Sequence, residues 1–352
     1  MLLLSMRATV AFLLSALSLA SAASARPSDP PDPGFGEEIT VALSTVTVRA
    51  VDALGNPLTG LTPEDFRVRV GRREIPVSAV DWFSSETGRP QPAPLAESPE
   101  PSLPEPQQPA GQLLVFFVQT DLNTSRISGQ LRLRPYTREL LDRLHPEDRI
   151  AVVSYDSHLK LWLDFTRDRD AVYAALDRAM LWSQEEDVEP AGDGDSLAAA
   201  FDREAARRAA SPEKALEVIG RALAAIPGEK SIVYLGWGLG RYTSWGVQMT
   251  PDYKPAVKAL SAAHATVFVL DVTSADYHSL EVGLQGVAEA TGGTYAKTNV
   301  LPGLATHALT RTLSGYYVLT LDQSELAGAQ GEVRIELRRE RGTILVRPVS
   351  VR

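Results

Sequence analysis

Continuous runs of apolar residues, separated by segments with helical spacing, constrain the fold of this chain most. Four such runs occur, at residues 113–118, 150–153, 231–235 and 266–270, and they are apolar throughout except for Ser231 and Thr266. An uninterrupted apolar run of this kind is typical of a strand that is buried on both faces. Between the runs, apolar residues recur with helical spacing, as at Tyr136, Leu140 and Leu144. Alternation of buried strands and helices predicts a doubly wound α/β domain with a mostly parallel sheet and helices on both faces.

The segments on either side of this domain show a different pattern. Apolar and polar residues alternate in residues 38–83 and again in residues 323–352. A period of two is typical of strands with one buried face. Each segment has too few strands to be stable alone, so we expect the two to join in one small β-sandwich. The α/β domain would then be an insertion over residues 112–322, with its last strand at residues 316–321.

Two segments have compositions that argue against a packed structure. Residues 84–111 are rich in Pro, Glu and Gln and hold almost no large apolar side chains, which predicts a semi-extended linker and a domain boundary. Residues 26–37 are rich in Pro, Asp and Gly and are predicted to be unstructured.

The first 25 residues have the three-part pattern of a secretory signal peptide. Arg7 supplies a positive charge, an apolar stretch follows over residues 8–20, and small residues then mark cleavage sites after Ala22 or Ala25. The apolar stretch is short for a membrane span. We therefore expect a mature protein that is periplasmic or secreted, without membrane insertion after cleavage.

Charge and composition exclude several classes of protein. The formal net charge of −9 and the lack of a Lys/Arg-rich tract argue against a nucleic-acid partner and against an anionic membrane surface. The chain has no cysteine, which excludes disulfides and thiolate metal sites. The five histidines are scattered, without the spacing of metal ligands.

The loop after the first buried strand carries Asp121, Asn123 and Ser125. These residues resemble the Asp-x-Ser-x-Ser loop of the von Willebrand factor A family, with Asn in place of the first Ser. The resemblance implies a metal-ion-dependent adhesion site, in which oxygen ligands hold a hard cation such as Mg²⁺. It places Ser196 in the position of the threonine that the family carries on a second loop.

The resemblance extends to both flanks of the chain. Residues 46–83, with Gly60-Leu61-Thr62-Pro63-Glu64-Asp65-Phe66, and Gly315-Tyr316-Tyr317-Val318-Leu319 are similar to bacterial exported proteins of the "VWFA-related" type. The resemblance implies a Rossmann-like von Willebrand A fold, and it says more about the fold than about the function. Together with the lack of a catalytic set, it favours binding over turnover.

One ligand of the family site has no counterpart in this chain. The family has an Asp after a later strand, whereas residues 236–238 are Gly-Trp-Gly. A hard cation is held mainly by carboxylate charge, so the missing Asp favours a degenerate site in which Asp121 hydrogen-bonds its own loop and Trp237 fills the space. No cofactor is expected; Mg²⁺ or another divalent cation at Asp121, Asn123, Ser125 and Ser196 is the alternative.

These observations predict an exported, non-enzymatic protein that mediates protein–protein interaction or adhesion through a protein or peptide partner. Trp237, Tyr242 and Trp245 follow one buried strand closely and either form an interaction surface or cover the edge of the sheet.

Two alternatives remain open. Gly194-Asp195-Ser196-Leu197 matches the nucleophile tag of GDSL esterases, so one alternative is a hydrolase that uses Asp121 and Ser196. The Asp-x-x-His that such enzymes need is missing; Asp276-Tyr277-His278 has the wrong spacing. The other alternative is a structural component of the cell envelope.

Overall fold

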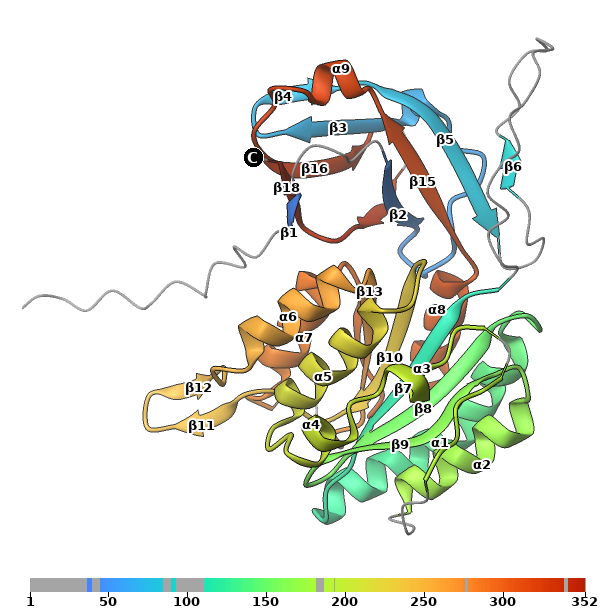
Figure 1. The fold of residues 1–352 in the computed structure, drawn as a ribbon, viewed down its shortest axis with the longest axis vertical. Coiled ribbons are helices and arrows are strands. Elements are labelled where there is room, and N and C mark those ends of the chain that lie inside the picture. Colours follow the sequence, from blue (N-terminus) through green and yellow to red (C-terminus); the bar gives the residue numbers. More distant parts are fainter. Residues whose placement is uncertain are drawn as a thin grey trace, which may run out of the picture. The chain divides into compact units, whose positions relative to one another are not determined.

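The computed structural model describes most of the chain after residue 36, within the unit Gly34–Arg352 (Figure 1). The described residues are 37–39, 45–84, 90–92, 111–181, 187–192, 194–275, 278–338 and 341–351. The predicted signal peptide, residues 26–36 and the linker residues 85–89 and 93–110 lie outside them.

A six-stranded sheet forms the centre of the α/β part, with the strand order β14-β13-β10-β7-β8-β9. The strands are β7 (Leu113–Gln119), β8 (Arg149–Tyr155), β9 (Leu159–Thr166), β10 (Lys230–Gly236), β13 (Ala265–Asp271) and β14 (Tyr295–Lys297). All neighbours are parallel except β8 and β9, which are antiparallel. Every residue of β7, β10 and β13 is buried. The predicted mostly parallel sheet is therefore confirmed.

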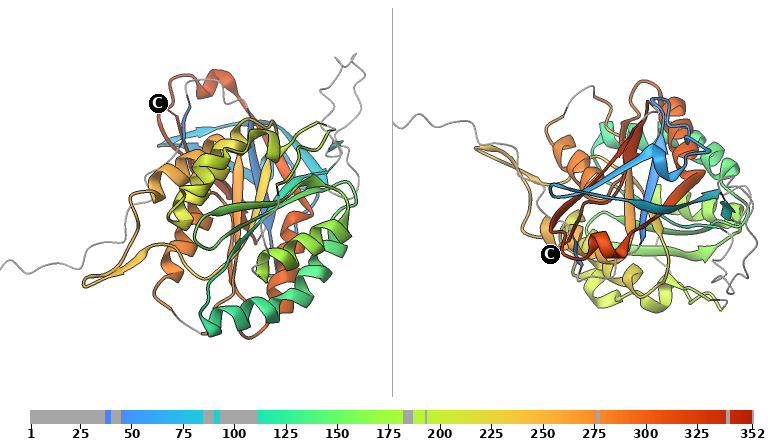
Figure 2. Two further views of the ribbon diagram at one scale, coloured as in Figure 1. Left: turned by 60° about the horizontal axis from the view of Figure 1, so that its bottom comes forward. Right: turned by 90° about the horizontal axis from the view of Figure 1, so that it is seen from above.

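Helices cover both faces of this sheet (Figure 2). One face holds α1 (Thr124–Arg143), α2 (Arg169–Met180) and α8 (Pro302–Leu313), and the other holds α3 (Leu197–Ala200), α4 (Arg203–Arg207), α5 (Pro212–Ala224), α6 (Tyr253–Ala262) and α7 (Glu281–Ala290). Successive residues of β7 alternate between the two cores: Phe116 packs on the first face and Phe117 on the second. A strand that feeds two cores explains the uninterrupted apolar runs.

The remaining strands form two five-stranded sheets. The first sheet has the strand order β1 (Glu37–Ile39), β18 (Val349–Val351), β16 (Gly331–Leu337), β3 (Phe66–Val70) and β4 (Arg73–Ile75). The second sheet has the strand order β17 (Thr343–Leu345), β2 (Thr45–Val51), β15 (Gly315–Leu321), β5 (Val77–Ser84) and β6 (Pro90–Pro92). Two short helices, η1 (Pro63–Asp65) and α9 (Gln323–Leu326), accompany them. Val48 and Tyr317 of one sheet share a hydrophobic cluster with Phe66 and Val333 of the other. N-terminal and C-terminal segments thus contribute to both sheets.

The position of β15 corrects the predicted domain boundary. Residues 316–321 were expected to end the α/β sheet, but β15 pairs antiparallel with β2 and β5, where Tyr317 lies opposite Val48 and Trp82. Along β15 buried residues alternate with half-exposed ones, because only one face of the strand is covered. The α/β part therefore ends with α8.

A half-buried carboxylate connects the β-sheets to the α/β part. Glu229 Oε1 accepts hydrogen bonds from Thr47 Oγ1 at 3.2 Å and from Arg347 Nη2 at 3.1 Å, and lies 3.4 Å from His264 Nδ1. Burial alone would raise the pKa of Glu229, but the hydrogen bond with His264 and the charges of Arg347 and Arg49 hold it below its usual value. Glu229 is therefore ionised at neutral pH.

A two-stranded hairpin, β11 (Arg241–Thr243) and β12 (Gly246–Gln248), leaves the chain between β10 and α6 and projects from the body of the α/β part (Figures 1 and 2). We call residues 241–248 the arm. In the part of the chain that the structure describes, no helix has the length and apolar character needed to cross a membrane.

Candidate functional site

The carboxyl ends of β7, β10 and β13 meet at one edge of the central sheet, where open α/β sheets bind their ligands. Gln119, the last residue of β7, is fully buried at this edge. Its Nε2 donates to Gly238 O at 2.8 Å, and its Oε1 accepts from Trp237 N at 3.0 Å. One amide side chain therefore fixes the loop after β10 to the end of β7.

The loop after β7 brings Asp121, Asn123 and Ser125 together. Asp121 Oδ1 accepts from Asn123 N at 3.0 Å, and Asn123 Oδ1 accepts from Ser125 N at 3.0 Å and from Ser125 Oγ at 2.7 Å. Asn123 is the N-cap of α1, a position at which asparagine is favoured because its side-chain oxygen accepts a hydrogen bond from the first turn of the helix. The oxygens that would bind a metal are therefore engaged in forming the start of a helix.

A guanidinium group lies beside these residues. Arg126, in the first turn of α1, forms an ion pair with the carboxylate of Asp121. The same guanidinium carbon lies 3.3 Å from the centroid of the Trp237 ring, a close cation–π contact. Asp121 and the loop after β10 thus share one fixed positive charge.

Ser196 does not join this group, contrary to the sequence-based expectation. Ser196 Oγ donates to Asp164 Oδ2 at 2.5 Å. Asp164 lies on the antiparallel strand β9, two residues before Thr166, which pairs with Ile150 near the start of β8. Ser196 therefore lies at the amino edge of the parallel strands, opposite Asp121.

The surroundings of Ser196 give it a structural role. It is the N-cap of α3, and its Oγ accepts from Ala199 N at 3.0 Å while donating its proton to Asp164. Asp164 also accepts from Leu197 N at 2.7 Å and from Ala191 N at 2.8 Å. A nucleophilic serine needs a base that can take its proton. The hydroxyl of Ser196 instead donates a hydrogen bond to Asp164, whose oxygens already accept hydrogen bonds from the backbone, so the contact serves to cap the helix.

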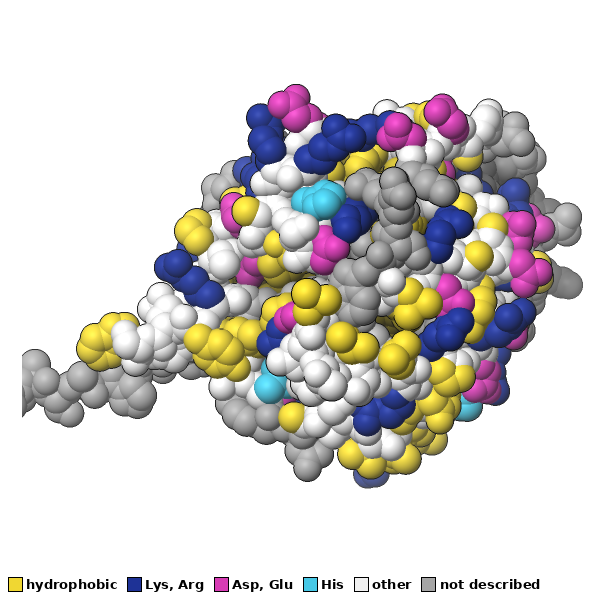
Figure 3. Space-filling view, turned by 90° about the horizontal axis from the view of Figure 1, so that it is seen from below, with side chains coloured by type: hydrophobic (Ala, Val, Ile, Leu, Met, Phe, Trp, Pro, Cys, Tyr) yellow, Lys and Arg dark blue, Asp and Glu magenta, His cyan; other side chains and the backbone are white. Residues whose placement is uncertain are grey.

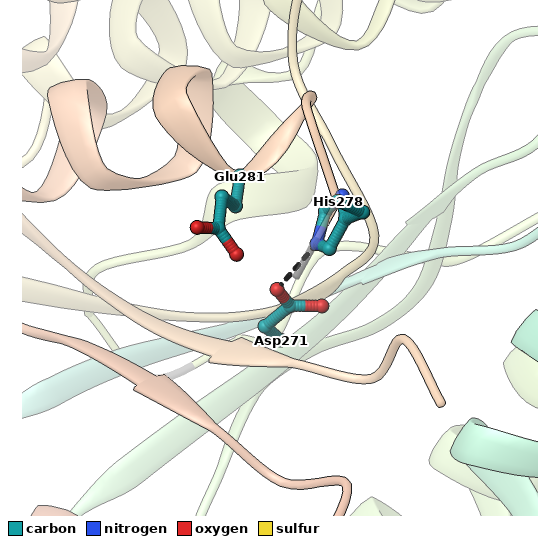
Figure 4. Close-up of side chains that lie close together, drawn as sticks. All are labelled: Asp271, His278 and Glu281. Carbon is teal, nitrogen blue, oxygen red and sulfur yellow. Dashed lines mark hydrogen bonds and ion pairs between the residues drawn. The ribbon is translucent and has the colours of Figure 1, made fainter. Parts of the chain in front are cut away.

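Beyond β13 lies a group of side chains that no sequence motif predicted. Asp271, the last residue of β13, is 2% exposed, and its Oδ2 lies 2.6 Å from His278 Nε2. Glu281, the first residue of α7, is 6% exposed. The three side chains point toward one another, and their ligand atoms all lie within 4.8 Å of one another (Figure 4). The only sequence signal is a carboxylate at the end of a buried strand.

Tyr295 and Lys297 of β14 border this group. Tyr295 OH donates to Asp271 Oδ2 at 2.6 Å and lies 3.4 Å from Glu281 Oε2. Burial raises the pKa of Tyr295, and the hydrogen bond to Asp271 raises it further, so the phenol stays protonated and acts as a donor. Lys297 Nζ lies 2.7 Å from Glu281 Oε2 at the rim of the group.

The three aromatic residues predicted to form a surface lie in two places. Tyr242 and Trp245 belong to the arm and are 62% and 90% exposed. Trp237 is half-buried against Arg126. Figure 3 shows hydrophobic side chains on the projecting arm. The arm therefore presents two of the three aromatic rings to solvent, and the third, in the loop after β10, packs against Arg126.

Comparison with known proteins finds similarity only among solved structures. No family model and no curated protein matches this chain. The conserved hypothetical protein BatB of Bacteroides thetaiotaomicron is 14% identical, with 58% of this chain and 98% of that chain covered and a TM-score of 0.39.

Two further similar structures are named as von Willebrand factor domains. The type A protein of Catenulispora acidiphila is 11% identical over 84% of this chain and 75% of its own, with a TM-score of 0.42. The domain of the type V pili tip protein Mfa5 of Porphyromonas gingivalis is 10% identical over 57% of this chain and 94% of its own, with a TM-score of 0.36. Because these TM-scores are below 0.5, the proposals below rest on the residues of this chain.

Proposed function

We propose that this chain is an exported binding module of the von Willebrand A type that contacts a protein or peptide partner through its arm. The observation that carries the proposal is Trp245, which is 90% exposed at the turn of a projecting hairpin. Exposed aromatic side chains are the residues that contribute most to protein interfaces when a partner buries them. Tyr242, on the adjoining strand, adds a second exposed ring.

The arm is built to hold its shape before it binds. Tyr242 pairs with Val247 across the hairpin, and Thr243 Oγ1 donates to Gly246 O at 2.8 Å while accepting from Trp245 N at 3.2 Å. Gly246 has a φ of 106°, a conformation that favours glycine at the turn. A preformed hairpin loses little conformational entropy on binding, which favours affinity.

We propose that binding does not require a metal ion at Asp121. The guanidinium of Arg126 already supplies a positive charge to this carboxylate. A hard cation would have to displace it with little help, since Gly236, Trp237 and Gly238 offer no carboxylate at the neighbouring strand end. Both observations support a degenerate site.

Export and the absence of catalysis belong to the same proposal. Arg7, the apolar stretch after it and the small residues before residue 26 support export to the periplasm or the medium. Asp121 and Ser196 lie at opposite edges of the sheet, which argues against a hydrolase that uses both. We also propose that the two five-stranded sheets act as one small β-sandwich, supported by their shared hydrophobic cluster.

The arm is tested by quantitative binding of the mature protein to its partner, isolated by cross-linking from the native envelope. Trp245→Ala is expected to weaken binding more than tenfold with an unchanged melting temperature. Leu54→Ala is the matched control, because Leu54 is 62% exposed like Tyr242 but lies in the N-terminal β segment. Full binding by the Trp245 variant would refute the proposal, and binding by the wild type that requires added Mg²⁺ would refute its independence of a metal at Asp121.

Catalysis has a separate test. A screen with generic ester substrates is expected to show no turnover by the mature protein. Turnover that disappears in Ser196→Ala would overturn the non-enzymatic proposal.

A further inference from the structure

We propose that Asp271, His278 and Glu281 form a binding site for one divalent transition-metal ion, and that Zn²⁺ fits their donor set best. The site lies at the carboxyl end of β13 and uses none of the residues of the Asp121 loop or the arm. It is therefore independent of the proposed protein-binding function.

Burial and charge favour a cation at this point. Asp271 and Glu281 are almost fully buried, and the His278 side chain is 13% exposed. Two carboxylates that share the Tyr295 hydroxyl bring two negative charges into a site with little access to water. Buried charges require a partner of opposite sign or a metal, because their desolvation is costly. Lys297 neutralises Glu281 from the rim only.

The chemistry of the donors selects the class of metal. One imidazole nitrogen and two carboxylate oxygens form a mixed nitrogen and oxygen set. Zn²⁺ binds such sets, whereas Mg²⁺ prefers oxygen ligands and retains its water molecules. Three protein ligands leave one position of a tetrahedral ion for water. In the structure, Asp271 Oδ2 and His278 Nε2 lie 2.6 Å apart, at hydrogen-bonding distance, and a bound metal would replace this hydrogen bond.

The groups around the three ligands hold them in position. Tyr295 OH donates to Asp271 Oδ2, and Thr273 N donates to Asp271 Oδ1 at 2.9 Å. Hydrogen bonds of this kind orient ligating carboxylates in metal sites. Asp271 ends a strand and Glu281 begins a helix, so two of the three ligands come from regular elements. Sites on regular elements are more precisely positioned than sites on loops.

The location gives the metal a structural consequence. Just after Asp271, Ser274 Oγ donates to Ser125 O at 3.2 Å, and Arg132 of α1 donates to Ser274 Oγ at 2.8 Å. A bound ion would hold Asp271 at the end of β13 to Glu281 at the start of α7. It would thereby support the hydrogen bonds that join Ser274 to α1. We therefore expect metal binding to raise the melting temperature.

The site is tested by calorimetric titration of the metal-free, tag-free mature chain with Zn²⁺. One ion per chain is expected to bind to the wild type. His278→Ala and Glu281→Gln should weaken binding more than about 100-fold, and Tyr295→Phe, which keeps all three ligands, about 10- to 100-fold. Co²⁺ is a second probe, since its visible spectrum reports nitrogen and oxygen coordination without thiolate. If the His278 variant does not fold, the Glu281 and Tyr295 variants and the Co²⁺ spectrum carry the test.

Matched variants identify the site that binds. His307→Ala is the first control, because His307 Nε2 also lies 2.9 Å from a carboxylate, Glu139, but at the surface. His307→Ala, Asp121→Ala and Trp245→Ala should all keep wild-type affinity for Zn²⁺. The proposal is overturned if the wild type binds no Zn²⁺, if His278→Ala binds it equally well, or if His307→Ala abolishes binding. If Trp245→Ala binds Zn²⁺ as the wild type does, the metal site can be tested independently of partner binding by the arm.

Discussion

Replacing Arg126 with Met should destabilise the protein measurably, although Arg126 lies at the surface. The substitution keeps most of the aliphatic stem and removes the charge. The ion pair with Asp121, whose partners are 24% and 28% exposed, contributes about 1 kcal/mol after solvent screening. The cation–π contact with Trp237 contributes about 0.5–2 kcal/mol. The expected loss is therefore about 1.5–3 kcal/mol.

Chemical unfolding of four proteins measures this loss and divides it into parts. The wild type, Arg126→Met, Asp121→Asn and the double variant form a double-mutant cycle. Asparagine retains the oxygen that accepts from Asn123 N, so the cycle isolates the ion pair. We expect a coupling energy of about 0.5–1 kcal/mol between Arg126 and Asp121. The remainder of the loss should persist in the Asp121→Asn background and report the contact with Trp237.

Arg138→Met is the matched control. Arg138 lies on the same helix, pairs with Asp170 at 3.4 Å and faces the ring of Tyr173 at 4.7 Å, but its side chain is much more exposed. Its replacement should change stability by no more than about 0.5 kcal/mol. Equal effects of the Arg126 and Arg138 variants would contradict the assignment of Arg126 as the cation that holds this edge together.

Three further predictions concern stability. The pKa of Glu229 is lower in the folded than in the unfolded protein, so its stabilising contribution is present at neutral pH and is lost as pH falls through the folded pKa. The difference in unfolding free energy between the wild type and Glu229→Gln should therefore shrink in acid. A difference that stays constant with pH would contradict this. Asp164→Ala should cost about 3 kcal/mol or more in urea unfolding, since it leaves several buried donors without an acceptor; a neutral effect would refute the capping role. Gly129→Ala should cost at least about 3 kcal/mol because the new Cβ would overlap Val272 O, whereas Gly192→Ala, with open space, should melt like the wild type.

Much of the fold was predictable because burial on two faces leaves a direct record in the sequence. The apolar runs became β7, β8, β10 and β13 within one or two residues of their expected ends. The assignment of β15 was wrong because Tyr316-Tyr317-Val318-Leu319 looks apolar throughout. Only its pairing with β2 and β5 shows that one face of this strand is covered. Apolar residues on the half-exposed face concealed the period of two.

The candidate sites show a similar division. Asp121, Asn123 and Ser125 are near neighbours in the sequence, so a single loop brings them together. The location of Ser196 depended on which edge of the sheet its loop reaches, which is determined by the direction of β9 and by the hydrogen bond to Asp164. No local pattern encodes that choice. Arg126 was missed because a lysine or arginine in a first helical turn is ordinarily a solvated side chain.

The two clusters at the carboxyl edge of the central sheet differ in the number of acids they contain. With Gly236 and Trp237 at that strand end, Asp121 has no second acid with which to share a divalent ion, and one positive charge from Arg126 is enough to neutralise it. On the next strand, Asp271 and Glu281 are two buried acids; the His278 imidazole lies beside Asp271, and Lys297 pairs with Glu281 from the rim. The proposed divalent ion would balance the two acids at β13, as the guanidinium of Arg126 balances Asp121 at β7. Zn²⁺ should therefore raise the melting temperature of Asp271→Asn less than that of the wild type, whereas Asp121→Asn should be stabilised as much as the wild type.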